Sequence, residues 1–150
     1  MAGCIFCRIV AGEVPADFVC ETPEIVSFLD AKPLFPGHVL VVPRTHVATL
    51  PEAGRALGGA LMETVQRLVP AVERALGAEG AFVAVNHKVS QSVPHLHAHV
   101  IPRRAKDGLR GFFWPRMPYA SDEEREDFGA RLRAALSAMS GQLPPGGPAR

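Results

Sequence analysis

The chain has 150 residues, a length typical of one domain, and 47% of them are hydrophobic, which is enough for one core. Sixteen Lys and Arg against 15 Asp and Glu give a formal net charge of +1, which argues against bulk nucleic-acid binding. No apolar run approaches the ~20 residues of a membrane helix, and no signal peptide is recognisable. Three cysteines without an export signal favour reduced thiols or metal ligands over disulfides, so we expect a cytoplasmic protein.

Two strands and a long helix are predicted in the first half of the chain. Apolar and β-branched residues at 24–30 and 38–42 predict the strands, and the turn residues of segment 32–37 separate them. Leucines and valines that recur every three or four residues predict a helix over residues 52–76. Pro70 lies inside this stripe, so we expect a kink or a break there, because proline has no N–H to donate.

Two further strands are predicted after this helix. Residues 81–86 are mostly apolar and predict the first of them. Residues 93–101 alternate polar and apolar side chains, as a strand with two different faces does. Pro102 is expected to end this strand, because proline cannot donate to a sheet ladder.

The chain is expected to close with a second helix and a tail. The helix is predicted over residues 122–139, where Ser121 and Glu124 have the form of a capping box. Residues 141–150 are rich in proline and glycine and predict a disordered tail, which leaves residues 1–140 as the domain. This order of strands and helices favours an α+β fold with a mainly antiparallel sheet.

Three histidines occupy alternate positions of the predicted strand 93–101. His95, His97 and His99 would share one face of it, with neighbours about 6.6 Å apart. A row of imidazoles can attack phosphorus, accept a proton or donate one near neutral pH. A polar strand face without chemistry is the alternative interpretation. One metal held by all three is disfavoured, because a straight strand separates His95 from His99 by about 13 Å.

The segment His95-Leu-His-Ala-His-Val-Ile resembles the signature of the histidine-triad family of nucleotide hydrolases and transferases. Other segments are similar to this family and occur in its order: the opening Cys4–Pro15, Phe28-Leu-Asp30, Pro36–His46, Asn86 and Gln91-Ser-Val93. The resemblance implies a histidine-triad α+β fold, with roughly five antiparallel strands and two helices. It also implies a homodimer in which the sheet continues from one subunit into the other.

The resemblance implies a role for each residue that matches the signature. His97 corresponds to the nucleophile that attacks the α-phosphate and forms a nucleotidyl-histidine intermediate. His99 corresponds to the group that contacts the phosphate and helps the leaving group, and His38 supports the imidazole row. Asp30 would hold the ribose hydroxyls and Phe28 would lie by the base. The groups implied around the phosphate and the leaving group are Asn86, Gln91, Ser92 and the backbone of Val93.

The activity implied is that of a purine nucleoside phosphoramidase or a dinucleoside polyphosphate hydrolase. The substrates would be nucleoside 5′-phosphate derivatives, namely phosphoramidates, aminoacyl adenylates or dinucleoside polyphosphates, and no catalytic metal is expected. The loop between Asn86 and Gln91 is shorter than the glycine-containing loop common in the family, which leaves the leaving group open. A non-catalytic nucleotide-binding or scaffold protein is the alternative, and a zinc-dependent hydrolase is a further one.

The pair Cys4-x-x-Cys7 is half of a zinc site. Resemblance to bacterial histidine-triad proteins implies that His46 and His95 complete it. Two cysteines and two histidines make a closed tetrahedral site, which is structural. Two buried, reduced thiols are the alternative interpretation. Cys20 has no evident partner and is expected to be a small apolar core residue.

Two features near the C-terminal end have no assigned role. The basic stretch that begins with Arg103 and ends at Arg110 is either a solvated surface or a patch that attracts polyphosphate. The aromatic segment 112–119 follows, and packing is its expected role. His87 is the one histidine that matches no part of the family signature.

Overall fold

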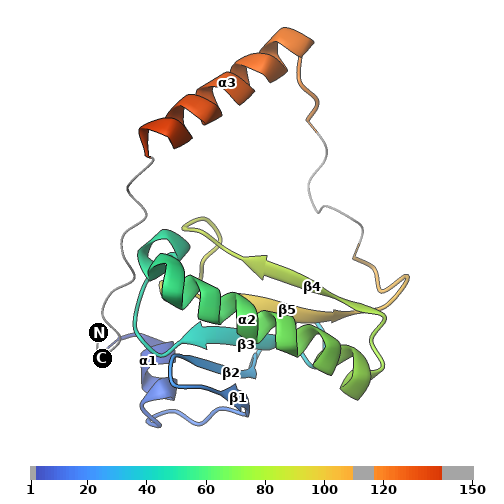
Figure 1. Cartoon of the computed structure of the whole chain (residues 1–150). Helices are drawn as coiled ribbons and strands as arrows, with labels where there is room; N and C mark the ends of the chain where they lie inside the picture. Colours follow the sequence, from blue (N-terminus) through green and yellow to red (C-terminus); the bar gives the residue numbers. More distant parts are fainter. Residues whose placement is uncertain (1–2, 110–116, 140–150) are drawn as a thin grey trace. The chain divides into compact units, whose positions relative to one another are not determined.

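The computed structural model describes residues 3–109 and 117–139, which contain three helices and five strands (Figure 1). In chain order these are α1 (Ile5–Val10), β1 (Phe18–Glu21), β2 (Ile25–Leu29), β3 (Val39–Pro43), α2 (Leu50–Leu76), β4 (Gly80–Val85), β5 (Ala98–Arg103) and α3 (Asp122–Ala138). All elements before α3 belong to one compact unit that runs as far as Ala105, and α3 belongs to a second unit, Lys106–Leu143. The predicted tail at 141–150 lies outside the described residues.

The five strands form one sheet in the order β1-β2-β3-β5-β4, and every neighbouring pair is antiparallel. This confirms the predicted α+β fold with a five-stranded antiparallel sheet. The central strand β3 is buried along its whole length. Its side chains alternate between two clusters, with Val39 and Val41 on one face of the sheet and Leu40 and Val42 on the other. Both faces of the sheet are therefore covered.

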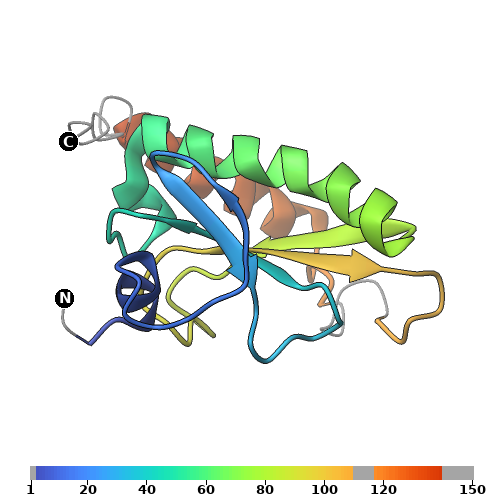
Figure 2. The ribbon, with the colours of Figure 1, turned by 90° about the horizontal axis from the view of Figure 1, so that it is seen from below.

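Each face is covered by a different helix (Figure 2). The apolar stripe of α2, which includes Leu61 and Val65, packs against residues of β2, β3 and β5. On the opposite face, Phe6 and Ile9 of α1 pack against alternate residues of β2 and β3. His99 pairs with Leu40 in the β3–β5 register and so belongs to the face that α1 covers.

The predicted helix over 52–76 is present, but its break lies at another residue. The helix continues through Pro70, whereas the backbone leaves helical conformation at Gly54 (φ 65°, ψ −178°). Glycine adopts this positive φ without a steric penalty. Pro70 removes the hydrogen bond to the carbonyl of Gln66, and Gln66 is exposed, where water can replace the missing donor. Of the kink or break expected at Pro70, the break is therefore wrong.

The strand that carries the histidines begins later and ends later than predicted. β5 starts at Ala98, so His95 and His97 precede it and only His99 lies on it. The preceding backbone bonds elsewhere, since Leu96 N–H donates to the carbonyl of Val47 (2.7 Å) rather than to a sheet ladder. Pro102 does not end the strand, because β3 pairs with β5 only as far as Val100 and leaves that side of Pro102 without a strand partner.

Two elements were not predicted. α1 is six residues long, too short to show a helical period. β1 is four residues long and three of them are exposed, so it has no apolar alternation. The expected two helices therefore become three in the described chain. A helical period can be recognised only in a helix of several turns, and the alternation of a strand only where one face is buried. α1 is too short for the first signal and β1 is too exposed for the second.

The second unit contains α3, and its predicted capping box is half present. Ser121 Oγ accepts a hydrogen bond from the Glu124 N–H (3.2 Å), whereas the Glu124 carboxylate accepts from Ala120 N–H instead of from Ser121 (2.6 Å). No residue of α3 is buried in the described structure. Among the described residues, no helix has both the length and the apolar composition that crossing a membrane would require.

Candidate active site and metal centre

His97 lies in a buried position where its tautomer is set by the backbone. Its Nδ1 lies 2.7 Å from the carbonyl oxygen of His95, and a carbonyl can only accept, so Nδ1 carries the hydrogen. In the neutral form of the ring, the other nitrogen, Nε2, then has the lone pair. The ring of Phe6 packs edge-on against His97 with centroids 5.1 Å apart, and the ring of His99 lies 4.9 Å away. The imidazole is thus aimed and holds a free nucleophilic nitrogen.

His99 is hydrogen-bonded to His38 through one nitrogen and unpartnered at the other. His38 Nε2 and His99 Nδ1 are 3.0 Å apart, whereas His99 Nε2 is buried with no hydrogen-bond partner among the described residues. Burial, then the neighbouring His97 and His38, lower the pKa of His99 to about 4. Burial also lowers the pKa of His38, against the opposing effect of Asp30. Both rings are therefore neutral at pH 7.

Asp30 lies at the other end of this pair. Its Oδ2 is 3.4 Å from His38 Nδ1, and its Oδ1 accepts a hydrogen bond from the Lys32 N–H (2.8 Å). Asp30, His38 and His99 offer ligand atoms within 4.8 Å of one another. However, Asp30 and His99 face opposite nitrogens of the His38 ring. A hydrogen-bonded line through His38 fits this geometry better than one ion shared by the three.

The short loop after β4 is closed by its own amide side chains. Asn86 Nδ2 donates to the carbonyl of Ser90 (3.2 Å), and Gln91 Oε1 accepts from Lys88 N–H (3.0 Å). Gln91 Nε2 donates to the carbonyl of Ala48 (2.7 Å). Lys88 and Ser90 have positive φ angles of 65° and 59°, a conformation that is uncommon for residues other than glycine. In this structure the amides of Asn86 and Gln91 are therefore used to hold the loop.

The remaining residues that were expected to contact nucleotide differ in exposure. Phe28 is only 2% exposed and packs edge-on against Phe6 and Phe18, with centroids 5.6 and 6.0 Å away. Ser92 is exposed and Val93 is half-buried. Phe28 thus lies within the core on the α1 face, whereas Ser92 is accessible from solvent.

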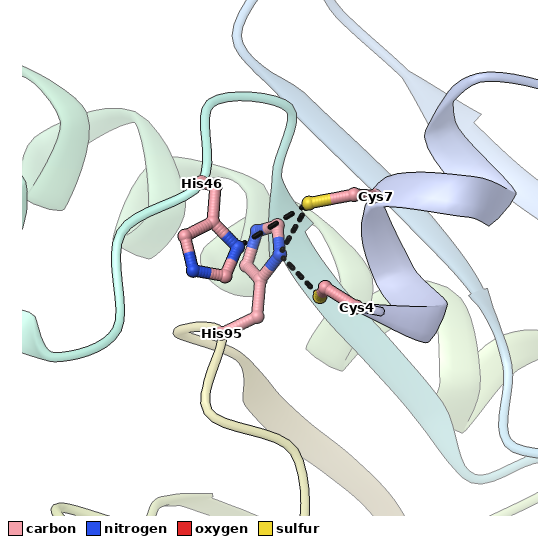
Figure 3. Close-up of side chains that lie close together, drawn as sticks. All are labelled: Cys4, Cys7, His46 and His95. Atoms are coloured by element: carbon pink, nitrogen blue, oxygen red, sulfur yellow. Dashed lines mark hydrogen bonds between the residues drawn. The ribbon is translucent and has the colours of Figure 1, made fainter. Parts of the chain in front are cut away.

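The structure brings together the four residues expected to bind metal. Cys4, Cys7, His46 and His95 offer ligand atoms that all lie within 4.8 Å of one another (Figure 3). Cys4 directly precedes α1 and Cys7 lies in it, whereas His46 follows β3 and His95 precedes β5. His95 Nδ1 is 3.4 Å from the Cys4 sulfur and 3.6 Å from the Cys7 sulfur. His46 Nδ1 is 3.3 Å from the Cys7 sulfur.

This donor set fits a tetrahedral zinc ion. Bonds of about 2.3 Å to sulfur and 2.1 Å to nitrogen, at tetrahedral angles, separate the two ligand atoms by about 3.6 Å. His95 Nε2 donates to the carbonyl of Pro43 (2.8 Å), so the lone pair is on Nδ1, the nitrogen that faces both sulfurs. Burial lowers the pKa of His95, and burial together with Cys4 raises the pKa of the Cys7 thiol. Cys20 is half-buried on β1 and outside this group.

Phe6 is a residue of this site that sequence reasoning missed. Its ring lies 5.9 Å from the ring of His95 and 5.1 Å from that of His97, edge-on to both. Phe6 is only 6% exposed. It therefore packs on one member of the metal group (Cys4, Cys7, His46 and His95) and on one member of the imidazole pair His97 and His99. The only sequence signal was its place between Cys4 and Cys7, which does not reveal a packing partner more than 80 residues away.

The comparisons with known proteins agree with this architecture. The model of the HIT domain matches residues 11–106, a span that contains all five strands and α2. The chain belongs to the HIT family. The histidine-triad resemblance is thereby confirmed. Cys4 and Cys7 precede the matched span, so the cysteine half of the metal group is not part of the HIT family match.

Three HIT proteins illustrate the similarity. The adenosine 5′-monophosphoramidase of Schizosaccharomyces pombe is 35% identical over 122 residues, which are 80% of this chain and 89% of that protein. The crystal structure of a HIT family protein from Bacillus subtilis has a TM-score of 0.79 at 30% identity, and covers 88% of this chain and 96% of its own. A Zn-bound histidine triad family protein from Mycobacterium smegmatis has a TM-score of 0.66 at 36% identity, and covers 93% of this chain and 97% of its own.

Proposed function

We propose that this HIT protein is a hydrolase or transferase that acts at the α-phosphate of nucleoside 5′-phosphate derivatives through a nucleotidyl-histidine intermediate. The observation that carries the proposal is the fixed tautomer of His97, whose Nδ1–H is bound to the carbonyl of His95. In the neutral ring this tautomer places the lone pair on Nε2, next to His99, whose own Nε2 is buried with no hydrogen-bond partner in the described part of the chain. The naming of the S. pombe relative as an adenosine 5′-monophosphoramidase supports the same class of activity, with phosphoramidates as first substrates.

The chemistry follows from which nitrogens are free. A phosphoryl group flanked by anionic oxygens repels anionic nucleophiles, so the neutral imidazole of His97 is suited to attack phosphorus. His99 would donate its proton to the departing amine, and a water molecule would then release the mononucleotide from His97. Ser92 is exposed beside this segment and would stabilise developing charge as a neutral donor. None of these steps requires a metal ion.

We also propose that Cys4, Cys7, His46 and His95 hold a structural zinc ion. The sulfur–nitrogen distances and the tautomer of His95 support this assignment, and the Zn-bound relative from M. smegmatis is consistent with it. The zinc would supply a cross-link that holds α1 against the segment of the imidazoles. His95 would then act twice, since its ring binds the ion while its backbone oxygen orients His97.

A homodimer with a continuous sheet is proposed from the same family resemblance. β4 is an edge strand of six residues with regular pairing to β5, whereas the opposite edge, β1, has a register shift between Phe18 and Cys20. A regular unpaired edge is the better template for a second copy. Light scattering of the purified protein would test the dimer. A cytoplasmic location is part of the proposal.

The test is a panel of nucleotides that vary in leaving group and base, assayed with the wild type and with His97→Ala. We expect turnover of at least one α-phosphate derivative by the wild type and none by the variant. Acid quench during turnover of a substrate labelled in the α-phosphate should trap label on the protein. A wild type that binds nucleotide but neither hydrolyses it nor retains label would contradict the proposal and favour a binding or scaffold protein.

A further inference from the structure

His38 Nδ1 faces a donor and an acceptor at the same distance. The Leu34 N–H points at this nitrogen from 3.4 Å, and the Asp30 carboxylate oxygen also lies 3.4 Å from it. An unprotonated Nδ1 accepts the hydrogen bond from Leu34, whereas a protonated Nδ1 donates to Asp30. The surroundings of His38 therefore support both of its neutral tautomers.

The tautomer of His38 determines that of His99. Their facing nitrogens, Nε2 and Nδ1, are 3.0 Å apart, so one hydrogen lies between them. When His38 Nδ1 is bare, His38 Nε2–H donates to His99, and the hydrogen of His99 is on its own Nε2. When His38 Nδ1 carries the hydrogen and donates to Asp30, His99 donates through Nδ1 and its Nε2 becomes bare.

The two ends of this line differ in access to solvent. His99 Nε2 is buried and has no partner among the described residues, so any proton that it gains or loses belongs to a bound reactant. At the other end the Asp30 side chain is 23% exposed, and its second oxygen is held by Lys32 N–H. The line thus connects a buried, reactive nitrogen with a carboxylate that water can reach.

We propose that Asp30 is a positioning residue that acts through His38 on His99, and that the three form a proton path between solvent and His99 Nε2. The inference rests on the proposed function, in which His99 protonates the leaving group. It adds a proton-transfer role for Asp30 to the ribose contact implied by the family resemblance. Lys32 contributes only its backbone N–H to this arrangement.

Each half of the reaction moves one proton along this path, in opposite directions, so the number of protons balances over a full turnover. In the first half, His97 Nε2 bonds to phosphorus and the phosphorus–nitrogen bond to the leaving amine breaks. His99 Nε2–H gives its proton to that amine, His38 Nε2–H passes a proton to His99 Nδ1, and solvent near Asp30 returns one to His38 Nδ1. In the second half, water attacks phosphorus, the bond to His97 breaks, and the water proton moves along the same line in reverse to solvent.

The charges around the line suit this transfer. The ionisable groups that act on the two rings are Asp30 and His97, together with the rings themselves. Burial keeps both rings neutral at pH 7, so a proton passes through them as a change of tautomer and no resting charge accumulates. Loss of the Asp30 charge weakens the acceptor that favours a protonated His38 Nδ1.

The experiment compares wild type, Asp30→Asn and the control Asp17→Asn. Asp17 is an exposed carboxylate whose backbone oxygen accepts from Leu29 N–H. The same change from aspartate to asparagine is therefore made at a residue outside the Asp30–His38–His99 line. Nitrogen-15 shifts of labelled histidine rings report each tautomer without requiring activity. Kinetics use adenosine 5′-phosphoramidate and its 2′,3′-dideoxy analogue, which has no ribose hydroxyl for Asp30 to bind. Asp30→Ser, which keeps an acceptor for Lys32 N–H, is the second variant if the first unfolds.

We expect Asp30→Asn to shift the ring-nitrogen signals of His38 and His99, and to lower kcat by about 10- to 100-fold for both substrates. Asp17→Asn should change neither. Unchanged ring signals, with a higher KM for the ribose substrate alone, would overturn the proposal and leave Asp30 as a ribose ligand. Failure of the proposed function is a separate outcome, because a wild type without turnover would still reveal whether Asp30 shifts the tautomers.

Discussion

The backbone oxygen of His95 accepts the Nδ1–H of His97 at 2.7 Å, while the His95 ring faces the sulfurs of Cys4 and Cys7. One histidine therefore belongs to the metal group through its side chain and orients the proposed nucleophile through its main chain. A displacement of His95 would alter the hydrogen bond that fixes the tautomer of His97. The proposed zinc site and the proposed active site therefore share one residue, although no metal is needed in the proposed chemistry.

Replacement of His97 by alanine should abolish turnover and leave the fold intact. We expect kcat to fall by roughly 10⁴-fold or more, because the attacking nitrogen is lost and neighbouring groups cannot replace it. Steady-state assays with a phosphoramidate and circular dichroism spectra would measure the two effects. His87→Ala is the matched control, since His87 is an exposed loop residue with no role in the proposal. Substantial turnover by the His97 variant would refute the assignment.

Removal of the metal should affect stability more than chemistry. We expect one zinc per chain in the wild type, and less in Cys7→Ser, because the ligand atoms of a closed tetrahedral site act together. An ion present at 100 times its dissociation constant stabilises the folded state by about 2.7 kcal/mol, so chelation should lower the unfolding midpoint. Elemental analysis and thermal unfolding are the measurements.

Cys20→Ser is the control for the metal prediction, because Cys20 lies outside the ligand group. It should keep the zinc content and the unfolding midpoint close to those of the wild type. A chelated protein that remains folded should retain most of its activity. Immediate loss of activity on chelation, without unfolding, would instead support a zinc-dependent hydrolase.

Stability should decline as the pH falls from about 6.5 to about 4. The pKa of His99 is lowered from 6.5 to about 4 in the folded protein, mainly by burial. Between these values the unfolded chain binds a proton that the folded chain does not, so unfolding becomes more favourable as pH falls. His38 contributes in the same direction, since burial lowers its pKa also. Urea unfolding at a series of pH values would give the slope.

The variant His99→Asn should show a smaller decline over this range, because one of the buried, titrating rings is gone. His87→Asn removes an exposed histidine and should leave the slope as in the wild type. Equal slopes in the wild type and the His99 variant would mean that His99 titrates normally in the folded state.

Phe6 should be important for both the fold and the imidazoles. Truncation to alanine removes a ring that is 6% exposed and packs on His95, His97 and Phe28, and should cost about 3–5 kcal/mol. Phe6→Leu should cost less but still lower kcat, because the edge-on contact with His97 is lost. Ile5→Ala is the neighbouring control, since Ile5 is 37% exposed. Chemical denaturation and kinetics would separate the two effects, and a Phe6→Ala protein as stable as Ile5→Ala would contradict the packing.

Much of the architecture could be predicted from local patterns. The strands β2, β3 and β4 and the helix α2 lie within two residues of their predicted limits, because the three strands are short apolar runs and the helix has an apolar stripe that repeats every three or four residues. The same patterns failed at β1 and α1, which are short, and at the start of β5. In the last case the alternation of His95, His97 and His99 is that of a strand, yet the backbone at Leu96 bonds to Val47.

The sequence by itself determined the chemistry available to this protein. The alternating histidines, the Cys4-x-x-Cys7 pair and the family resemblance indicate both groups of side chains. Only the tertiary structure decided which atoms face one another: His97 Nδ1 on the His95 carbonyl, His38 between Asp30 and His99, and Phe6 against the rings of His95 and His97. These contacts join residues far apart in the chain, and their directions depend on the register and packing of the sheet, which residue types and spacing do not encode locally.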